Sequence, residues 1–213
     1  MPEAVKAPPA GMLARATWSE PHHEDGAVKV QVGFPPAMRL AGISSHLWLD
    51  NGGRLTRIVQ EMVAAPPSLP TELVLTDEVR AAVDGAPDNG TPEVVADVDR
   101  DGAPHASLRG SAQAVSDTQL AMWIRDPAGG LLVAIENSPR LALMCRDPAK
   151  GVTYQFPGRA RVDDDPDVVA TVYANTPSLE RDMDAIRREV AGVVDLDLAE
   201  GMGPGGQVRM ERA

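Results

Sequence analysis

Short apolar runs cut by turn-forming residues fill residues 92–162 of this 213-residue chain. Asp101-Gly102 and Ser116-Asp117 are turn signals between such runs, and the segment DPAKG at 147–151 is another. This spacing is typical of an antiparallel barrel. It predicts strands over residues 93–99, 104–115, 120–125, 140–146 and 152–162, with a short helix within LLVAIENSP at 131–139.

The first of these strands alternates apolar and polar residues. We expect Val94, Ala96 and Val98 to face inward, or Val95 to pack against a covering element instead. The next two strands are separated from it and from each other by the turns named above. Asp-Gly is a hairpin signal because the glycine tolerates positive φ.

The chain before this region has less regular patterns. AVKVQVGF at 27–34 alternates and predicts one strand that faces inward through Val28, Val30 and Val32. Asn51-Gly52-Gly53 is a turn signal, and the spacing of the apolar residues after it predicts an amphipathic helix over 54–63. A Pro-rich linker follows at 65–70. We expect residues 1–72 to be an extension that packs on the barrel or on a partner subunit, where Trp18 and Trp48 could cover a neighbouring groove.

Helices are predicted on both sides of the barrel region. The first covers 73–83, with Thr76 as N-cap and Val79 and Val83 on one face. The second covers 178–191, and the alternating segment VVDLDLAEG at 193–201 then predicts a last strand. Residues 202–213 are expected to be a C-terminal tail, so the main domain spans 73–201. Asp163-Asp164-Asp165-Pro166 lacks the spaced ligands of a calcium loop and predicts a solvated turn at a helix start.

The composition excludes several functional classes. A net charge of -11 and an aromatic content of 3% argue against nucleic-acid binding, because phosphate backbones would be repelled and stacking platforms are scarce. The single cysteine, Cys145, excludes an internal disulfide and is expected to be a small buried hydrophobic residue. We expect no metal site, because His22 and His23 belong to an exposed turn. No signal peptide or membrane span is recognised, and the expected location is the cytoplasm.

Several segments occur in an order that resembles a known family. They are DVDRDGAP, LAMWIRDPAGG, ENSPRLAL, a strand closing on GRARV, and VVDLDLAEG. Together they resemble the pyridoxamine 5'-phosphate oxidase-like family of flavin-binding split barrels over about residues 73–201. The resemblance implies a mainly β fold with flanking helices, namely a six-stranded antiparallel split barrel that forms a homodimer. It also implies that flavin mononucleotide (FMN) lies in a groove at the subunit interface and oxidises or reduces a small organic substrate.

The resemblance also suggests where the cofactor binds. Its phosphate would meet the second and third strands and the loop after them, and guanidinium groups and loop amides suit a phosphate chemically. The candidate cofactor-binding residues are Ser107, Arg109, Trp123, Arg125, Gly129, Gly130, Gly158 and Arg159. No catalytic residue is assigned.

The chain departs from the family at two places. Ala128-Gly129-Gly130 stands where flavin-binding members often carry Thr, then Ser and Lys or Arg, and the C-terminal QVRMERA lacks the Arg-x-His signature of the true oxidase. Three alternatives therefore stay open for the cofactor: a deazaflavin or haem, a flavin phosphate held by the arginines alone, or a cofactor-free groove for another ligand. Oxidation of pyridoxamine phosphate is not expected.

Overall fold

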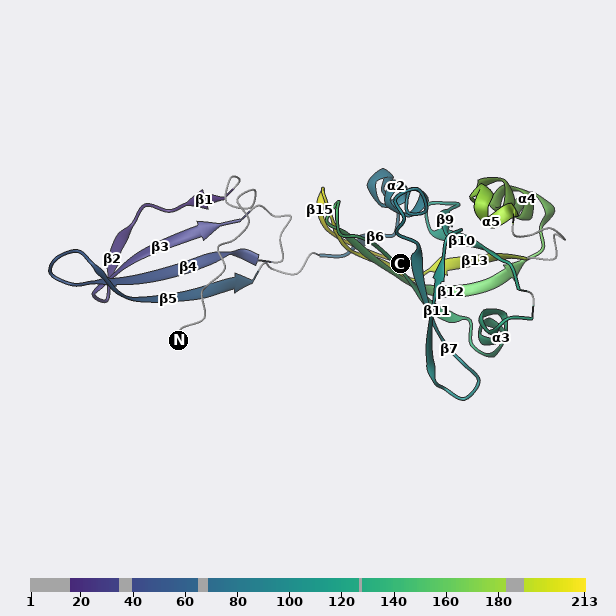
Figure 1. The fold of residues 1–213 in the computed structure, drawn as a ribbon, viewed down its shortest axis with the longest axis horizontal. Coiled ribbons are helices and arrows are strands. Elements are labelled where there is room, and N and C mark those ends of the chain that lie inside the picture. Colours follow the sequence, from purple (N-terminus) through teal and green to yellow (C-terminus); the bar gives the residue numbers. More distant parts are fainter. Residues whose placement is uncertain (1–15, 35–39, 65–68, 127, 183–189) are drawn as a thin grey trace. The chain divides into compact units, whose positions relative to one another are not determined.

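The chain divides into two compact units, residues 1–67 and residues 68–213. The computed structural model describes residues 16–34, 40–64, 69–126, 128–182 and 190–213. In these residues each unit is built around its own sheet, and the helices belong to the second unit (Figure 1). We call the two units unit 1 and unit 2.

Unit 1 is an antiparallel sheet in which β3 pairs with β4 and β4 with β5, while β1 and β2 both pair with β3. The predicted strand at 27–34 is confirmed as β3, with Val32 buried and Val28 and Val30 half-buried. Asn51-Gly52-Gly53 forms the predicted turn between β4 and β5. The strands are β1 (Thr17–Trp18), β2 (His22–Glu24), β3 (Ala27–Gly33), β4 (Leu40–Leu49) and β5 (Leu55–Ala64).

The helix predicted over residues 54–63 is wrong, because this segment is strand β5. Its apolar residues have helical spacing, but Ile58 is 50% exposed and Met62 is 75% exposed, so the spacing does not mark a buried helix face. β-Branched residues such as Val59 and Val63 favour a strand, and the preceding turn aligns the segment with β4. Pairing with β4 therefore outweighs the helical pattern.

Unit 2 contains ten strands and four helices in its described residues. Its predicted elements at 93–99, 120–125, 140–146 and 152–162 and the helix after the Gly-rich loop are confirmed, with ends that differ by one or two residues. The strands are β6 (Thr71–Glu72), β7 (Glu93–Val98), β8 (Pro104–Arg109), β9 (Gln113–Ala114), β10 (Gln119–Ile124), β11 (Arg140–Asp147), β12 (Val152–Asp163), β13 (Val190–Leu196), β14 (Leu198–Gly203) and β15 (Gly206–Glu211). The helices are α2 (Asp77–Asp84), α3 (Gly130–Asn137), α4 (Pro166–Asn175) and α5 (Ser178–Asp182).

Strand β12 is the branch point of the sheet in unit 2. One edge of β12 pairs with the whole of β11 through residues Val152–Arg159. The other edge of β12 pairs with β14 at Thr153–Gln155 and with β13 at Gly158–Asp163. From β11 the sheet continues to β7 and β8, and from β13 it continues to β10 and β9. The strand predicted over 104–115 is interrupted at residues 110–112, so that β8 pairs with β7 and β9 with β10. The ladders among the described residues thus form an open, branched sheet and not a closed barrel.

The helices cover the sheet and enclose two apolar clusters. Helix α2 begins one residue after Thr76, whose Oγ1 accepts a hydrogen bond from the N–H of Val79 (3.4 Å), as predicted for the N-cap. Val79 and Val83 on its buried face join the main core. On the other face, α4 packs against β10 and β13, and its Tyr173 meets the ring of Trp123 edge-on at 5.2 Å.

The inward face of β7 is the reverse of the first expected alternative. Glu93, Val95 and Asp97 point into unit 2, while Ala96 and Val98 are exposed. The outward set is all apolar and the inward set holds Val95 between two acidic residues, so the pattern favoured the wrong face, and the pairing with β8 and β11 decides the orientation. The second of the alternatives, an inward Val95, is the one found.

The C-terminal part has more strands and helices than predicted. Residues 206–211 form β15, paired with β14 and burying Met210, so the segment 202–213 is not a loose tail. Helix α4 was not predicted, although Asp165 caps it in the turn expected to start a helix. Of the helix predicted over 178–191, residues 178–182 are helical, 183–189 lie outside the described residues, and 190–191 belong to β13.

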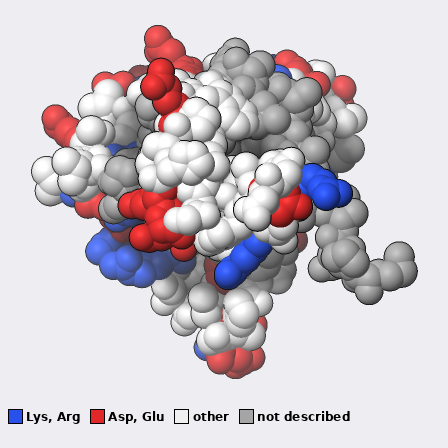
Figure 2. All heavy atoms as spheres, turned by 90° about the vertical axis from the view of Figure 1, so that its left-hand side faces the viewer, with Lys and Arg blue, Asp and Glu red and all other residues white. Residues whose placement is uncertain are grey.

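Acidic and basic side chains both occur among uncharged residues on the surface in view in Figure 2. Some opposite charges in unit 1 form ion pairs, and Lys29 Nζ lies 2.8 Å from Glu24 Oε2. No helix within the described ranges is long and apolar enough to cross a membrane.

Candidate functional site

A hollow of about 390 Å³ lies where β8 and β10 end and α3 begins. It brings together four of the eight predicted site residues: Arg109, Arg125, Gly129 and Gly130. Ile124, Asp126 and Leu131 complete its lining. We call this space the arginine hollow.

Local structure explains why these residues converge. Arg109 is the last residue of β8, and Arg125 directly follows the last residue of β10. The loop then turns at Asp126, whose Oδ1 accepts a hydrogen bond from the N–H of Ala128 (3.0 Å) and whose carbonyl accepts one from the N–H of Gly129 (3.0 Å). Gly129 is the N-cap of α3 but has no side chain to accept from the first-turn N–H groups. The positive end of α3 therefore opens beside the two arginines.

Two polar groups on the inward face of β8 have no hydrogen-bond partner among the described residues. They are Nε of Arg109 and Oγ of Ser107, two positions earlier on the same side of the strand. Burial lowers the pKa of Arg109, and the nearby charge of Arg125 lowers it further. Both effects disfavour the charged guanidinium, and an anion beside Arg109 would favour it, as the charges of Asp97 and Glu180 already do. An anion that accepted hydrogen bonds here would also satisfy the two buried donors.

Glu180 of α5 also reaches the arginines. Its Oε2 lies 3.2 Å from Nε of Arg125. A Cβ built on Gly110, the residue after Arg109, would lie 2.8 Å from Oε1 of Glu180. Sequence reasoning missed this residue, because it is far along the chain and nothing in its local pattern marks it. It also missed Asp126, although its position directly after Arg125 could have identified it.

The other predicted residues lie outside the lining of the arginine hollow. Trp123 packs on Tyr173 of α4. Arg159 is exposed on β12, where it lies opposite Asp195 of β13 in the ladder. At Gly158 a Cβ would lie 2.5 Å from the carbonyl oxygen of Asp195, so this glycine allows the close approach of β13.

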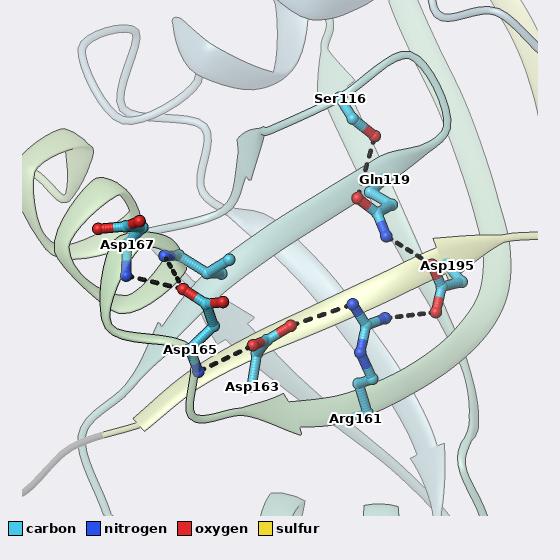
Figure 3. Close-up of polar contacts among 8 residues, drawn as sticks. Ser116, Gln119, Arg161, Asp163, Asp165, Asp167 and Asp195 are labelled. Carbon is cyan, nitrogen blue, oxygen red and sulfur yellow. Dashed lines mark hydrogen bonds and ion pairs between the residues drawn. The ribbon is translucent and has the colours of Figure 1, made fainter.

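A second hollow, of about 260 Å³, lies between α4 and the face of the sheet that carries Arg161. Figure 3 shows the polar network beside it, which runs from Ser116 through Gln119 and Asp195 to Arg161 and on to Asp163. It continues through Asp165, which accepts from the first N–H groups of α4. Asp167 takes part through its backbone N–H, and the network joins α4 to three strands.

The solved structures similar to this chain include proteins of the family that the sequence resembles. No protein-family model matches the chain, and no curated protein does. A Lactobacillus delbrueckii protein described as a pyridoxamine 5'-phosphate oxidase is 19% identical over 59% of this chain and 93% of its own, with a TM-score of 0.45. Its description names the family that the sequence resembles.

Two further neighbours differ in the ligand named for them. An FMN-binding protein of Syntrophomonas wolfei is 8% identical over 57% of this chain and 83% of its own, with a TM-score of 0.43. A haem-binding protein of Mycobacterium smegmatis is 14% identical over 62% of this chain and 57% of its own, with a TM-score of 0.43. The neighbours thus include binders of both cofactors.

Proposed function

We propose that this chain is a flavin-dependent oxidoreductase that holds the phosphate of FMN in the arginine hollow. The observation that carries the proposal is the convergence of Arg109, Arg125 and the start of α3 on one space. Guanidinium groups bind phosphate oxygens through paired hydrogen bonds, and first-turn N–H groups add donors. The unsatisfied Nε of Arg109 and Oγ of Ser107 fit the same anion.

The residues of the hollow would bind and orient the cofactor. Arg125 is 43% exposed and able to meet an incoming ligand, while the more buried Arg109 would hold the phosphate from the strand side. A bound flavin supplies hydride or electron transfer, which needs no nucleophile from the protein. The substrate is proposed to be a small organic molecule.

We further propose that β7 to β13 form a six-stranded split barrel, with β8 and β9 counted as one strand, and that two copies pair. The outward face of the β7–β8 hairpin supports this pairing. It presents Val98 at 42% and Leu108 at 65% exposure, together with the exposed Ala96 and Ala106. The half-buried Ala142 and Met144 of β11 continue the same face. An apolar face of this kind is typical of a surface that a partner covers.

Titration of the purified protein with FMN, followed by quenching of flavin fluorescence, tests the cofactor. We expect Arg125→Gln and Arg109→Gln each to weaken FMN binding at least about tenfold, the scale of losing a charged hydrogen bond. Riboflavin, which lacks the phosphate, should bind equally to all variants. Arg146→Gln removes an exposed arginine outside the hollow and serves as the matched control. Absence of FMN binding, or binding of haem or a deazaflavin in its place, would refute the proposal.

Light scattering of the full chain tests the pairing. Leu108→Glu places a charge on the apolar face and should convert a dimer into a monomer. Leu179→Glu makes the same change at a side chain of α5 that is 67% exposed and should leave the mass unchanged. A wild-type monomer, or a dimer that Leu108→Glu leaves intact, would contradict the proposed interface.

A further inference from the structure

We infer that Glu180 is a resident anion beside the arginine hollow that competes with phosphate ligands, because a ligand has to displace this carboxylate from Arg125. The inference rests on the proposed function, since it concerns ligands of the same site. It assigns a competing role to a residue of α5 that neither the motif order nor the strand pattern identified.

The Glu180 carboxylate lies between Arg125 and the backbone that follows Arg109. One oxygen lies 3.2 Å from Nε of Arg125. The other lies beside Gly110, where an added Cβ would be only 2.8 Å away, directly after Arg109 in the chain. The Glu180 side chain is 22% exposed, against 43% for Arg125, so the carboxylate lies deeper than the guanidinium it pairs with. A phosphate that approaches Arg125 from solvent therefore meets a site already held by an acidic group.

The charges of the site balance without a ligand. Arg109 and Arg125 supply the positive charge, while Asp126 in the lining and Glu180 beside Arg125 supply the negative charge. A phosphate group that replaced Glu180 could contact the guanidinium groups of both Arg109 and Arg125. A phosphate group that entered beside Glu180 would be repelled by its negative carboxylate. Ion pairs between partly exposed side chains are weak, so a ligand can displace Glu180 from Arg125 at a small cost in free energy.

This competition weakens the binding of any ligand that places a phosphate on Arg125. The cost of displacing Glu180 is the same whether the phosphate belongs to FMN or to another phosphate ligand, so Glu180 lowers the affinity for all of them. Glu180 should have no effect on riboflavin, which has no phosphate.

Comparison of Glu180→Gln with Asp182→Asn tests the inference in the full chain. Both changes remove one negative charge from α5, but Asp182 is exposed and makes no ion pair with the residues that the structure describes. We expect Glu180→Gln to tighten FMN binding about twofold to fivefold, the upper part of the range for a partly exposed pair. Glu180→Ala should act in the same direction. Asp182→Asn should leave FMN binding unchanged.

The outcomes separate this inference from the proposed function. If Arg125→Gln weakens FMN binding while Glu180→Gln leaves it unchanged or weakens it, FMN binding stands and Glu180 only orients Arg125, which overturns the inference. If no variant binds FMN, the proposed function fails, and thermal shifts with inorganic pyrophosphate decide the role of Glu180. A larger shift in Glu180→Gln than in wild type then supports a resident anion, and equal shifts overturn it.

Discussion

Replacing Glu93 by glutamine should stabilise the protein at neutral and alkaline pH. This side chain of β7 is fully buried, and neither of its carboxylate oxygens has a hydrogen-bond partner among the described residues. Burial raises the pKa of Glu93 from 4.5 to about 8, and the negative charge of Asp84 contributes in the same direction. The carboxyl group is therefore largely protonated in the folded protein at pH 7, while it is ionised in the unfolded chain.

The direction of the pH dependence follows from the two protonation states. The pKa of Glu93 is higher in the folded protein than in the unfolded chain. The stability that depends on this carboxyl group being protonated is therefore complete below pH 4.5 and is lost as the pH rises through about 8. Each unit of difference between the folded and unfolded pKa corresponds to about 1.4 kcal/mol. The loss in unfolding free energy is thus about 3 kcal/mol at pH 7 and about 5 kcal/mol well above pH 8. Glutamine has no proton to lose and escapes this cost.

Urea unfolding at pH 5, 7 and 9 measures the effect. The difference in unfolding free energy between Glu93→Gln and wild type should grow with pH by several kcal/mol. Glu136→Gln, at an exposed position of α3, should give a pH profile parallel to that of wild type. If the profile of Glu93→Gln were also parallel to wild type, Glu93 would be ionised and solvated in the folded state, and the reasoning would be wrong.

Two further predictions concern packing. Gly158→Ala should lower the unfolding free energy by about 1–3 kcal/mol, because the new Cβ would lie 2.5 Å from the carbonyl oxygen of Asp195. Gly130→Ala, where a Cβ meets nothing within 4 Å, should leave stability in urea unchanged or slightly raised, and equal losses in both variants would contradict this reasoning. Cys145 should resist a thiol reagent at pH 8 until urea unfolds the protein, because burial raises the pKa of its thiol to about 12. Rapid labelling of the native protein would show that the thiol is accessible.

Local patterns predicted the elements of unit 2 where turn residues and apolar runs agreed. Thr76 marked the start of α2 because its hydroxyl accepts from the helix backbone, an interaction that depends on neighbours in sequence. The same reasoning failed at β5, where Ile58 and Met62 suggested a helix. The conformation of these two residues is decided by the pairing of β5 with β4, and the helical spacing of apolar residues gives no information about that pairing. The orientation of β7 likewise depends on the strands beside it.

The candidate site was predictable only in part, for a related reason. Arg109, Arg125 and the glycines that follow lie at strand ends joined by short connections, so their proximity follows from the order of strands. Trp123 and Arg159 were grouped with them, but Trp123 packs on Tyr173 of α4 and Arg159 lies on β12, and neither lines the hollow. Glu180 reaches the site through tertiary packing of α5, which no local pattern contains.

The parallel pairing of β6 with β15 brings the first strand of unit 2 beside its last strand. Thr71 lies opposite Met210, so the first and last strands of the unit are neighbours across a ladder. Because the two strands are parallel, a linker long enough to run back beside β6 could join residue 213 to residue 69 without unfolding either strand. New ends could then be opened in the exposed turn at residues 99–103. Unit 2 is therefore suited to circular permutation, in which the strands keep their positions in the sheet while their order along the chain changes.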